Sequence, residues 1–476
     1  MNTSGNVRMG YVVFLSVVAA IGGILFGYDT AVISGTTDIV ARQFSLDELA
    51  KGWYVGCALI GSIAGVLVAG MLSDYLGRKK TMLISALMFS VSAIGCAVCA
   101  DMTQLVVFRM IGGFGIGVVS IVSPAYISEI AVPEKRGMLV SLYQLAITVG
   151  FLLAYLVNFL VLRNADTSLS TTDAHIRSIQ PLAVRMFNSE YWRGMLGYET
   201  IPDLLFLLVI FFIPESPRWL IVKGRSSQAA GVLSCIYPAS ADVEGQLALT
   251  KASIAGEVKS EWKALLEPGI RTAVLLGSAI AILGQFMGVN AVLYYGPEIF
   301  KDAGFEDPLF STVLVGVVNM LTTVIALLII DKVGRKQLVY WGVSGMVVCL
   351  LMIALYFLPS THLPTWFMLT FFLLYVFFLL YVFCTAISIC AVIFVLLGEM
   401  YPNRVRGLAM SVAGFALWVG TYLIGQLTPW MLKNLTPAGT FFLFAFMCLP
   451  YLWIMWRRIP ETTGKTLEEI EAYWKR

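Results

Sequence analysis

Two charged residues lie inside segments that are otherwise apolar. Asp29 falls within an apolar stretch at about 9–34, and Arg109 opens a glycine-rich apolar stretch at about 104–127. A carboxylate inside a bilayer costs several kcal/mol unless it is paired, protonated or hydrated. An ion pair that forms when Asp29 loses a proton and breaks when it gains one would couple proton binding to a conformational change. The alternative is a static structural ion pair.

Two further carboxylates begin a later apolar stretch at about 194–213. Glu199 either assists a proton path or sits at the membrane boundary in a pair with Arg193, and the sequence leaves both open. Asp203 lies one helical turn further along, where we expect an extra carboxylate that faces water.

A second group of charges occurs twice in the chain, at a nearly constant offset. The Asp and Arg of an Asp-x-x-Gly-Arg-Lys-like turn recur after 257 residues, and a Glu…Pro…Arg-Gly segment recurs after 270. The repeated charges are Asp74 and Asp331, Arg78 and Arg335, Glu129 and Glu399, and Arg136 and Arg406. A duplicated membrane bundle places a substrate site between its halves, so the repeat indicates transport.

The elements that must position these residues are long apolar helices. The 476-residue chain is 59% hydrophobic and only 13% charged, with a mean hydropathy of +0.83. Soluble chains carry roughly a quarter charged residues, so a soluble enzyme is excluded. Runs of about 20 apolar residues span a bilayer as helices. We predict spans at 9–34, 52–72, 80–100, 104–127, 138–160, 194–213, 272–299, 308–330, 337–358, 365–397, 406–430 and 438–457.

The placement of basic residues predicts the orientation. They cluster after the even-numbered spans, for example Lys79 and Lys80 after the second and Arg457 and Arg458 after the twelfth. Because positive charge marks the cytoplasmic side, we expect both termini there. The eight cysteines read as small packing residues rather than disulfides or a metal site.

The chain is therefore predicted to be an all-α membrane protein with twelve transmembrane helices in two six-helix bundles. The expected division is an N-terminal bundle at 1–214, a cytoplasmic linker with short helices at 215–270, a C-terminal bundle at 271–458 and a cytoplasmic tail at 459–476.

Several motifs resemble those of the sugar porters of the major facilitator superfamily. Besides the two basic turns, they are Arg109 to Gly117, Pro214 to Leu220, Gln285 to Tyr295 and the tail from Pro460 to Glu471. Found in family order across nearly the whole chain, they make the resemblance specific. The opening segment from Gly22 to Gly35 is most similar to that of bacterial D-xylose:proton symporters.

The resemblance implies roles for three groups of residues. Asp29, Arg109 and Glu199 would couple protons to transport. The sugar would bind Gln144, Gln285, Asn290, Asn319, Tyr294, Tyr295, Phe26, Phe394 and Trp418. The eight repeated charges would form cytoplasmic salt bridges that gate the transporter, although orientation of the helices alone would also explain the basic turns. Any single polar residue could instead be an interhelical hydrogen bond.

Gln285 and Asn290 are five positions apart, so an ideal helix does not place them on one face; they converge if the helix breaks near Gly288.

The chain also departs from the family pattern at Gly284, where the family has a glutamine, at Phe394, where it has a tryptophan, and at Leu417, where it has a glutamine. These changes remove hydrogen-bonding groups, so the substrate could be another sugar or a polyol.

We therefore expect a proton-coupled importer of xylose or a related pentose or hexose that works by alternating access. The alternatives are a facilitative sugar or polyol uniporter and a non-transporting sugar sensor. The expected partners are the monosaccharide, the proton and the lipid bilayer of a cell inner membrane, with no nucleic acid, and the chain is expected to function as a monomer. No enzyme activity, organic cofactor or metal is expected.

Overall fold

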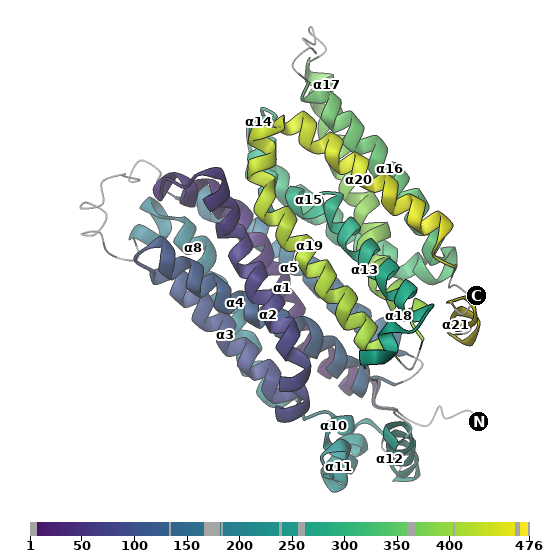
Figure 1. Cartoon of the computed structure of the whole chain (residues 1–476). Coiled ribbons are helices and arrows are strands. Elements are labelled where there is room, and N and C mark those ends of the chain that lie inside the picture. The colour runs from purple at the N-terminus through teal and green to yellow at the C-terminus, as the bar shows by residue number, and fades with distance from the viewer. Residues whose placement is uncertain are drawn as a thin grey trace. The chain divides into compact units, whose positions relative to one another are not determined.

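The computed structural model describes residues 7–132, 135–165, 181, 184–237, 240–255, 262–358, 367–402, 405–461 and 467–474. Within these ranges the chain is all-helical, and twelve segments are long and apolar enough to span a membrane (Figure 1). The predicted number of spans and their order are confirmed. The segments are Met9–Gln43, Glu48–Leu76, Arg78–Val98, Met102–Ile130, Arg136–Asn164, Trp192–Phe212, Ile270–Asp302, Pro308–Ile330, Arg335–Tyr356, Leu374–Met400, Arg406–Asn434 and Thr436–Arg457.

The first half supplies the helices α1 to α12. The membrane helices are α1 (Met9–Gln43), α2 (Glu48–Leu76), α3 (Arg78–Val98), α4 (Met102–Ile130), α5 (Arg136–Asn164), α8 (Trp192–Gly197) and α9 (Thr200–Val209). The linker helices are α10 (Pro217–Val222), α11 (Ser226–Ile236) and α12 (Ser240–Ala255), which pack on one another. Helix α10 begins at the N-cap Ser216 with Pro217 in its first turn, a favourable start because proline has no N–H to leave unpaired.

The second half supplies α13 to α21. These are α13 (Ile270–Phe286), α14 (Val289–Asp302), α15 (Pro308–Val333), α16 (Arg335–Tyr356), α17 (Phe367–Thr385), α18 (Ala391–Met400), α19 (Arg406–Asn434), α20 (Thr436–Arg457) and α21 (Leu467–Trp474). Three spans are broken within the bilayer: the sixth between α8 and α9, the seventh between α13 and α14, and the tenth at a π-helical turn at Ala386–Cys390. Such breaks change the direction in which nearby side chains point and are common at functional sites.

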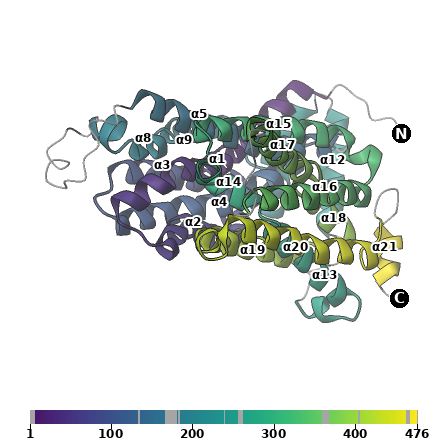
Figure 2. The same cartoon turned by 90° about the horizontal axis from the view of Figure 1, so that it is seen from above.

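Two compact units can be recognised. Unit 1 contains residues 1–30, 60–151 and 196–259, and unit 2 contains residues 31–59, 152–195 and 260–476. In unit 1, α3 packs on α4 and α9. In unit 2, α13 packs on α19 and α16 on α20, and α16 and α20 lie next to each other in Figures 1 and 2. The predicted domain boundaries at the linker remain a prediction.

Unit 2 includes parts of α1, α2 and α5, and polar contacts join its α2 and α5 segments to later helices. Lys51 Nζ lies 2.5 Å from Glu298 Oε1. The hydroxyl of Tyr155 donates to the carbonyl of Leu293 at 2.9 Å, and the Gln426 amide donates to the carbonyl of Leu49 at 2.9 Å. The units therefore cut through helices rather than between them.

Within unit 1, glycines bring helix backbones into direct contact. A Cβ atom added at Gly27 of α1 would lie 2.0 Å from the carbonyl oxygen of Ile147 in α5, and one at Gly150 would lie 2.1 Å from that of Ile24. The contact is reciprocal, so both positions need glycine. Small residues of this kind let membrane helices approach closely, where packing rather than water drives association.

Candidate functional site

The two charges buried in the membrane segments form an ion pair. Asp29 of α1 and Arg109 of α4 are 1% and 2% exposed, and the guanidinium Nη1 binds Asp29 Oδ1. The same Nη1 also donates to the backbone carbonyl of Asp29 at 3.4 Å. The second carboxylate oxygen of Asp29 is buried and has no hydrogen-bond partner among the described residues. The pair thus joins α1 to α4, while half of the carboxylate is left available for a proton.

Glu199 lies at the break between α8 and α9. Pro202 cannot donate the hydrogen bond that a continuous helix would make to the carbonyl of residue 198, and this favours a break here. The Glu199 side chain is 3% exposed, and its Oε1 has no hydrogen-bond partner within the described ranges. The electrostatic neighbours of Glu199 are Asp29, Asp203 and Arg109.

The boundary pair considered for Glu199 is made by another residue. Arg193 Nε binds Glu190 Oε2, and Arg185 Nη2 binds the same oxygen at 2.7 Å. The other oxygen of Glu190 accepts a hydrogen bond of 2.7 Å from the amide of Gln43. Burial raises the pKa of Glu190, but the hydrogen bonds and charges of Arg193 and Arg185 outweigh it and hold that pKa below its ordinary value.

The predicted break in the seventh span is present. Helix α13 ends at Phe286, and α14 begins after Gly288, whose φ is +87°. The side-chain nitrogen of Asn290 donates to Gln285 Oε1 at 2.7 Å, and Thr421 Oγ1 donates to the same oxygen at 3.1 Å. The Tyr381 hydroxyl donates to the carbonyl of Met287 at 2.7 Å and holds the break in place. The two amides therefore converge as the sequence predicted for a broken helix.

The remaining predicted sugar residues of unit 2 lie on helices near this break. Tyr294 and Tyr295 of α14 are buried, and the Tyr295 hydroxyl donates to the carbonyl of Gly425 at 2.6 Å. Asn319 of α15 and Trp418 of α19 are each 8% exposed. The side chain of Phe394 lies outside the described side chains.

Gln144 of α5 and Phe26 of α1 belong to unit 1, where both are partly buried. Their assignment to the sugar site stays a prediction.

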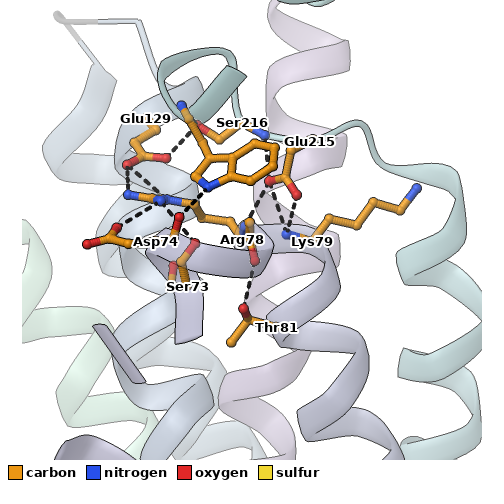
Figure 3. A network of polar contacts seen from close by, with 10 residues as sticks. Ser73, Asp74, Arg78, Lys79, Thr81, Glu129, Glu215 and Ser216 are labelled. Carbon is orange, nitrogen blue, oxygen red and sulfur yellow. Dashed lines mark hydrogen bonds and ion pairs between the residues drawn. The ribbon is translucent and has the colours of Figure 1, made fainter. Parts of the chain in front are cut away.

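In unit 1, the first set of repeated charges forms a network around Arg78 (Figure 3). Arg78 begins α3, and its Nη2 lies 2.9 Å from Glu129 Oε1 at the end of α4. Its Nη1 lies 3.2 Å from Asp74 Oδ1 at the end of α2. Arg136 begins α5 and is exposed, and it lines a hollow together with Ser128, Glu129, Arg218 and Thr250. Asp74, Arg78 and Glu129 are thus brought into contact, as expected, while Arg136 lies at the edge of the hollow.

Sequence reasoning missed the part that Glu215 plays in this network. Its carboxylate accepts the backbone N–H groups of Arg78 at 2.9 Å and Lys79 at 3.1 Å, so it caps α3, whose own N-cap Gly77 has no capping side chain. Ser216 donates to Glu129 Oε2 beside it (Figure 3). A helix start without a local cap, as at Gly77, is the signal that could have prompted a search for a remote carboxylate.

Unit 2 repeats the plan of the basic turn. Arg335 begins α16, and its Nη2 lies 3.0 Å from Glu399 Oε1 of α18. Gly334 before it has φ +97°, against +99° for Gly77 in the first turn. In the part of the chain that the structure describes, Arg406 Nε and Nη2 are buried without a hydrogen-bond partner. The side chain of Asp331 lies outside the described side chains.

Comparison with known proteins places this arrangement. The family described as "Sugar (and other) transporter" matches residues 15–474. The chain belongs to this sugar transporter family. The arabinose-proton symporter of Bacillus subtilis strain 168 is 36% identical over 469 residues, which cover 98% of this chain and 96% of that protein. The D-xylose-proton symporter of Escherichia coli strain K12 is 34% identical over 519 residues, covering 100% and 98%.

Solved structures agree with the family assignment. The inward-open conformation of the xylose transporter XylE from E. coli matches with a TM-score of 0.82 at 33% identity, covering 98% of this chain and 100% of that one. The resemblance and the major facilitator fold expected from the sequence are thereby confirmed. As a member of the sugar transporter family, the protein is a multi-pass membrane transporter rather than an enzyme.

Proposed function

We propose that this transporter imports a monosaccharide together with protons and that Asp29, Arg109 and Glu199 couple the two. The observation that carries the proposal is the buried Asp29–Arg109 pair, because both charges lie in membrane segments. Buried ion pairs are weak contributors to stability, since desolvation offsets much of their attraction. A pair kept at such a cost is well suited to act as a switch.

The switch follows from the charge of Asp29. While Asp29 is ionised, its attraction to Arg109 holds α1 against α4. A proton on the carboxylate removes that attraction and leaves Arg109 to find other acceptors. A difference of a few kcal/mol is enough to move a two-state equilibrium, so proton binding can set which side of the membrane the sugar site faces.

The sugar site proposed for unit 2 centres on the break at Gly288. Gln285 and Asn290 supply amide donors and acceptors, and Asn319, Tyr294, Tyr295 and Trp418 belong to helices α14, α15 and α19 beside it. Amides for hydroxyl groups and rings for the sugar face are the combination that a sugar needs. The substrate proposed is xylose or a related pentose or hexose, as for the named relatives. Phe394 of α18 is proposed to add a ring to this site, and Gln144 and Phe26 of unit 1 remain sugar contacts predicted from the resemblance.

The repeated charges are proposed to gate the transporter on the cytoplasmic side of a bacterial inner membrane, where both termini lie. Exposed ion pairs contribute only about 0–1 kcal/mol each, but several acting together bias a two-state equilibrium. The monomer is the proposed functional unit.

Uptake into proteoliposomes tests the coupling. A panel of labelled sugars and polyols is offered with and without an inward proton gradient to the wild type, to Asp29→Asn and to the exposed-carboxylate control Glu306→Gln. We expect gradient-driven accumulation in the wild type and the control, and only equilibrative exchange in Asp29→Asn. Uptake that ignores both the gradient and the Asp29 change would make the protein a uniporter and contradict the proposal.

A further inference from the structure

Asp203 is a buried acid that the coupling scheme above does not use. We expected this side chain to face water, but it is 0% exposed. Neither of its carboxylate oxygens has a hydrogen-bond partner among the described residues. An ionised carboxylate there would bear its full desolvation cost with nothing to offset it, whereas the neutral acid costs far less. The geometry therefore suits a carboxyl group that carries a proton.

The charges around Asp203 point the same way. Helix α9 packs on α3, and its Phe206 reaches toward Gly22 of α1. The titratable groups that interact electrostatically with Glu199 or Asp203 from the neighbouring helices are Tyr28 and Asp29 of α1, Cys96 of α3 and Arg109 of α4. Arg109 is the cation of this set, and it is bound to Asp29. Its charge is thus already matched before Glu199 and Asp203 are counted.

The backbone places Asp203 and Glu199 on one face of the helix. They are four residues apart, and the N–H of Asp203 donates to the carbonyl of Glu199 at 3.1 Å. Residues at this spacing have Cβ atoms about 5–6 Å apart on one helix face. Glu199 Oε1 is also buried without a partner in the described part of the chain, so each acid presents an oxygen that is free to accept a proton.

We propose that Asp203 is a second proton-binding residue of this transporter, which exchanges a proton with Glu199 during the transport cycle. In that exchange the O–H bond of the Asp203 carboxyl group breaks and an O–H bond forms on the Glu199 carboxylate. During the transfer the pair holds one proton and one negative charge, and the next proton that enters from the gradient returns Asp203 to the neutral acid. The inference rests on the proposed coupling and extends it, because the proton then has a binding site beyond Asp29.

A proton suits this cluster better than a metal ion. No group of three or more His, Cys, Asp or Glu side chains among the searched residues is arranged to hold a metal. A proton needs only one carboxylate oxygen, and Asp203 offers two that are buried and have no hydrogen-bond partner within the described part of the chain.

Infrared difference spectroscopy of the full-length protein in lipid tests proton binding directly. Spectra at low and high pH are compared for the wild type, Asp203→Asn and Glu306→Gln. We expect Asp203→Asn to lack one carboxylic-acid C=O band that the wild type and the control both show. An unchanged set of bands in Asp203→Asn would overturn the proposal, whether or not transport is proton-driven.

Proteoliposome uptake with the same variants tests the part that this proton plays in transport. Asp203→Asn is expected to reduce gradient-driven accumulation by about a hundredfold, the lower end of the range for loss of a proton-transfer group, while sugar counterflow stays near that of the wild type. Preserved counterflow shows that the variant is folded and still binds sugar. If Asp203→Asn does not fold, Asp203→Ser is used in its place. Asp203→Glu, which keeps the carboxyl group, should recover the coupling.

The two proposals fail in different ways. Wild-type coupling in Asp203→Asn, or accumulation driven by a sodium gradient that the change abolishes, would overturn the role of Asp203 as a proton site. If Asp29→Asn loses coupling while Asp203→Asn keeps it, the proposed function stands and only the role of Asp203 is overturned. Gradient-independent uptake by the wild type would instead overturn the proposed function, and with it the coupling role assigned to Asp203.

Discussion

Asn290 donates a hydrogen bond of 2.7 Å to the side-chain oxygen of Gln285, five positions earlier in the chain. In a continuous helix, five positions amount to about 500° of rotation, so the two side chains would point in different directions. The break at Gly288 brings them together, and Thr421 adds a second donor to the same oxygen. The amides thus orient each other, which would lower the entropy cost of binding at the proposed sugar site.

Removal of either amide should weaken sugar binding. A hydrogen bond contributes about 0.5–1.5 kcal/mol net, so Gln285→Ala and Asn290→Ala are each expected to raise the Kd for sugar by roughly two- to thirteenfold. Titration calorimetry on purified protein measures this. Asn434→Ala removes an exposed amide that bonds only to its own helix and should leave the Kd unchanged. Equal Kd values for all three variants would rule out a sugar site at the break.

Gly288→Ala should be strongly destabilising. The left-handed conformation at φ +87° costs a residue with a Cβ about 1–2 kcal/mol. The added Cβ would also lie 2.3 Å from Cδ2 of Phe444, so the ring must move. We expect a lower Tm and weaker sugar binding. Gly414→Ala is the matched control, since nothing lies within 4 Å of its added Cβ. A Tm for Gly288→Ala equal to that of the control would contradict the geometry.

Glu215→Ala should weaken the basic turn of unit 1. Its carboxylate caps α3, and loss of a helix N-cap costs about 0.5–2 kcal/mol. Because Arg78 begins that helix, we expect both a lower Tm and a changed balance between transport states. Thermal unfolding and uptake rates of Glu215→Ala and Glu244→Ala, an exposed acid on α12, provide the comparison. A Tm for Glu215→Ala equal to that of Glu244→Ala would show that the cap does not contribute to stability.

Acid should remove the contribution that Glu190 makes to stability. The pKa of Glu190 is lowered in the folded protein from an ordinary value of about 4.5. Its stabilising effect is therefore present above that value and is lost as the pH falls through the lower folded-state pKa. The Tm difference between wild type and Glu190→Gln is expected to be largest near neutral pH and to shrink below about pH 4.5. A difference that is constant with pH would contradict the pairing with Arg185 and Arg193.

The sequence predicted the spans because hydrophobicity alone dictates where a helix enters the bilayer. It also predicted the repeated turns from the recurring Gly-Arg-Lys pattern. In the structure, Gly77 and Gly334 have nearly equal φ and precede the arginines that begin α3 and α16. The break at Gly288 followed from the spacing of two amides. These features are local, so a single stretch of chain is enough to reveal them.

Other features depend on partners far apart in the chain. Glu215 caps a helix that begins 137 positions earlier, and no local pattern announces such a contact. Arg193, the partner considered for Glu199 at the membrane boundary, binds Glu190 instead, and the electrostatic neighbours of Glu199 are Asp29, Asp203 and Arg109. The expectation that Asp203 faces water is wrong, since its side chain is 0% exposed: α9 packs on α3, a contact between segments about a hundred positions apart.

The reciprocal glycine contact between α1 and α5 makes these helices a stiff mechanical link. Gly27 lies two positions before Asp29, and Gly150 lies six positions after Gln144. Because the two backbones are in contact here, a shift of α1 near Asp29, the proposed proton-binding residue, would be passed to α5, which carries the proposed sugar contact Gln144. A change of charge at Asp29 would then reach the proposed sugar contact through the movement of two packed helices, without any chain of hydrogen bonds between the two residues.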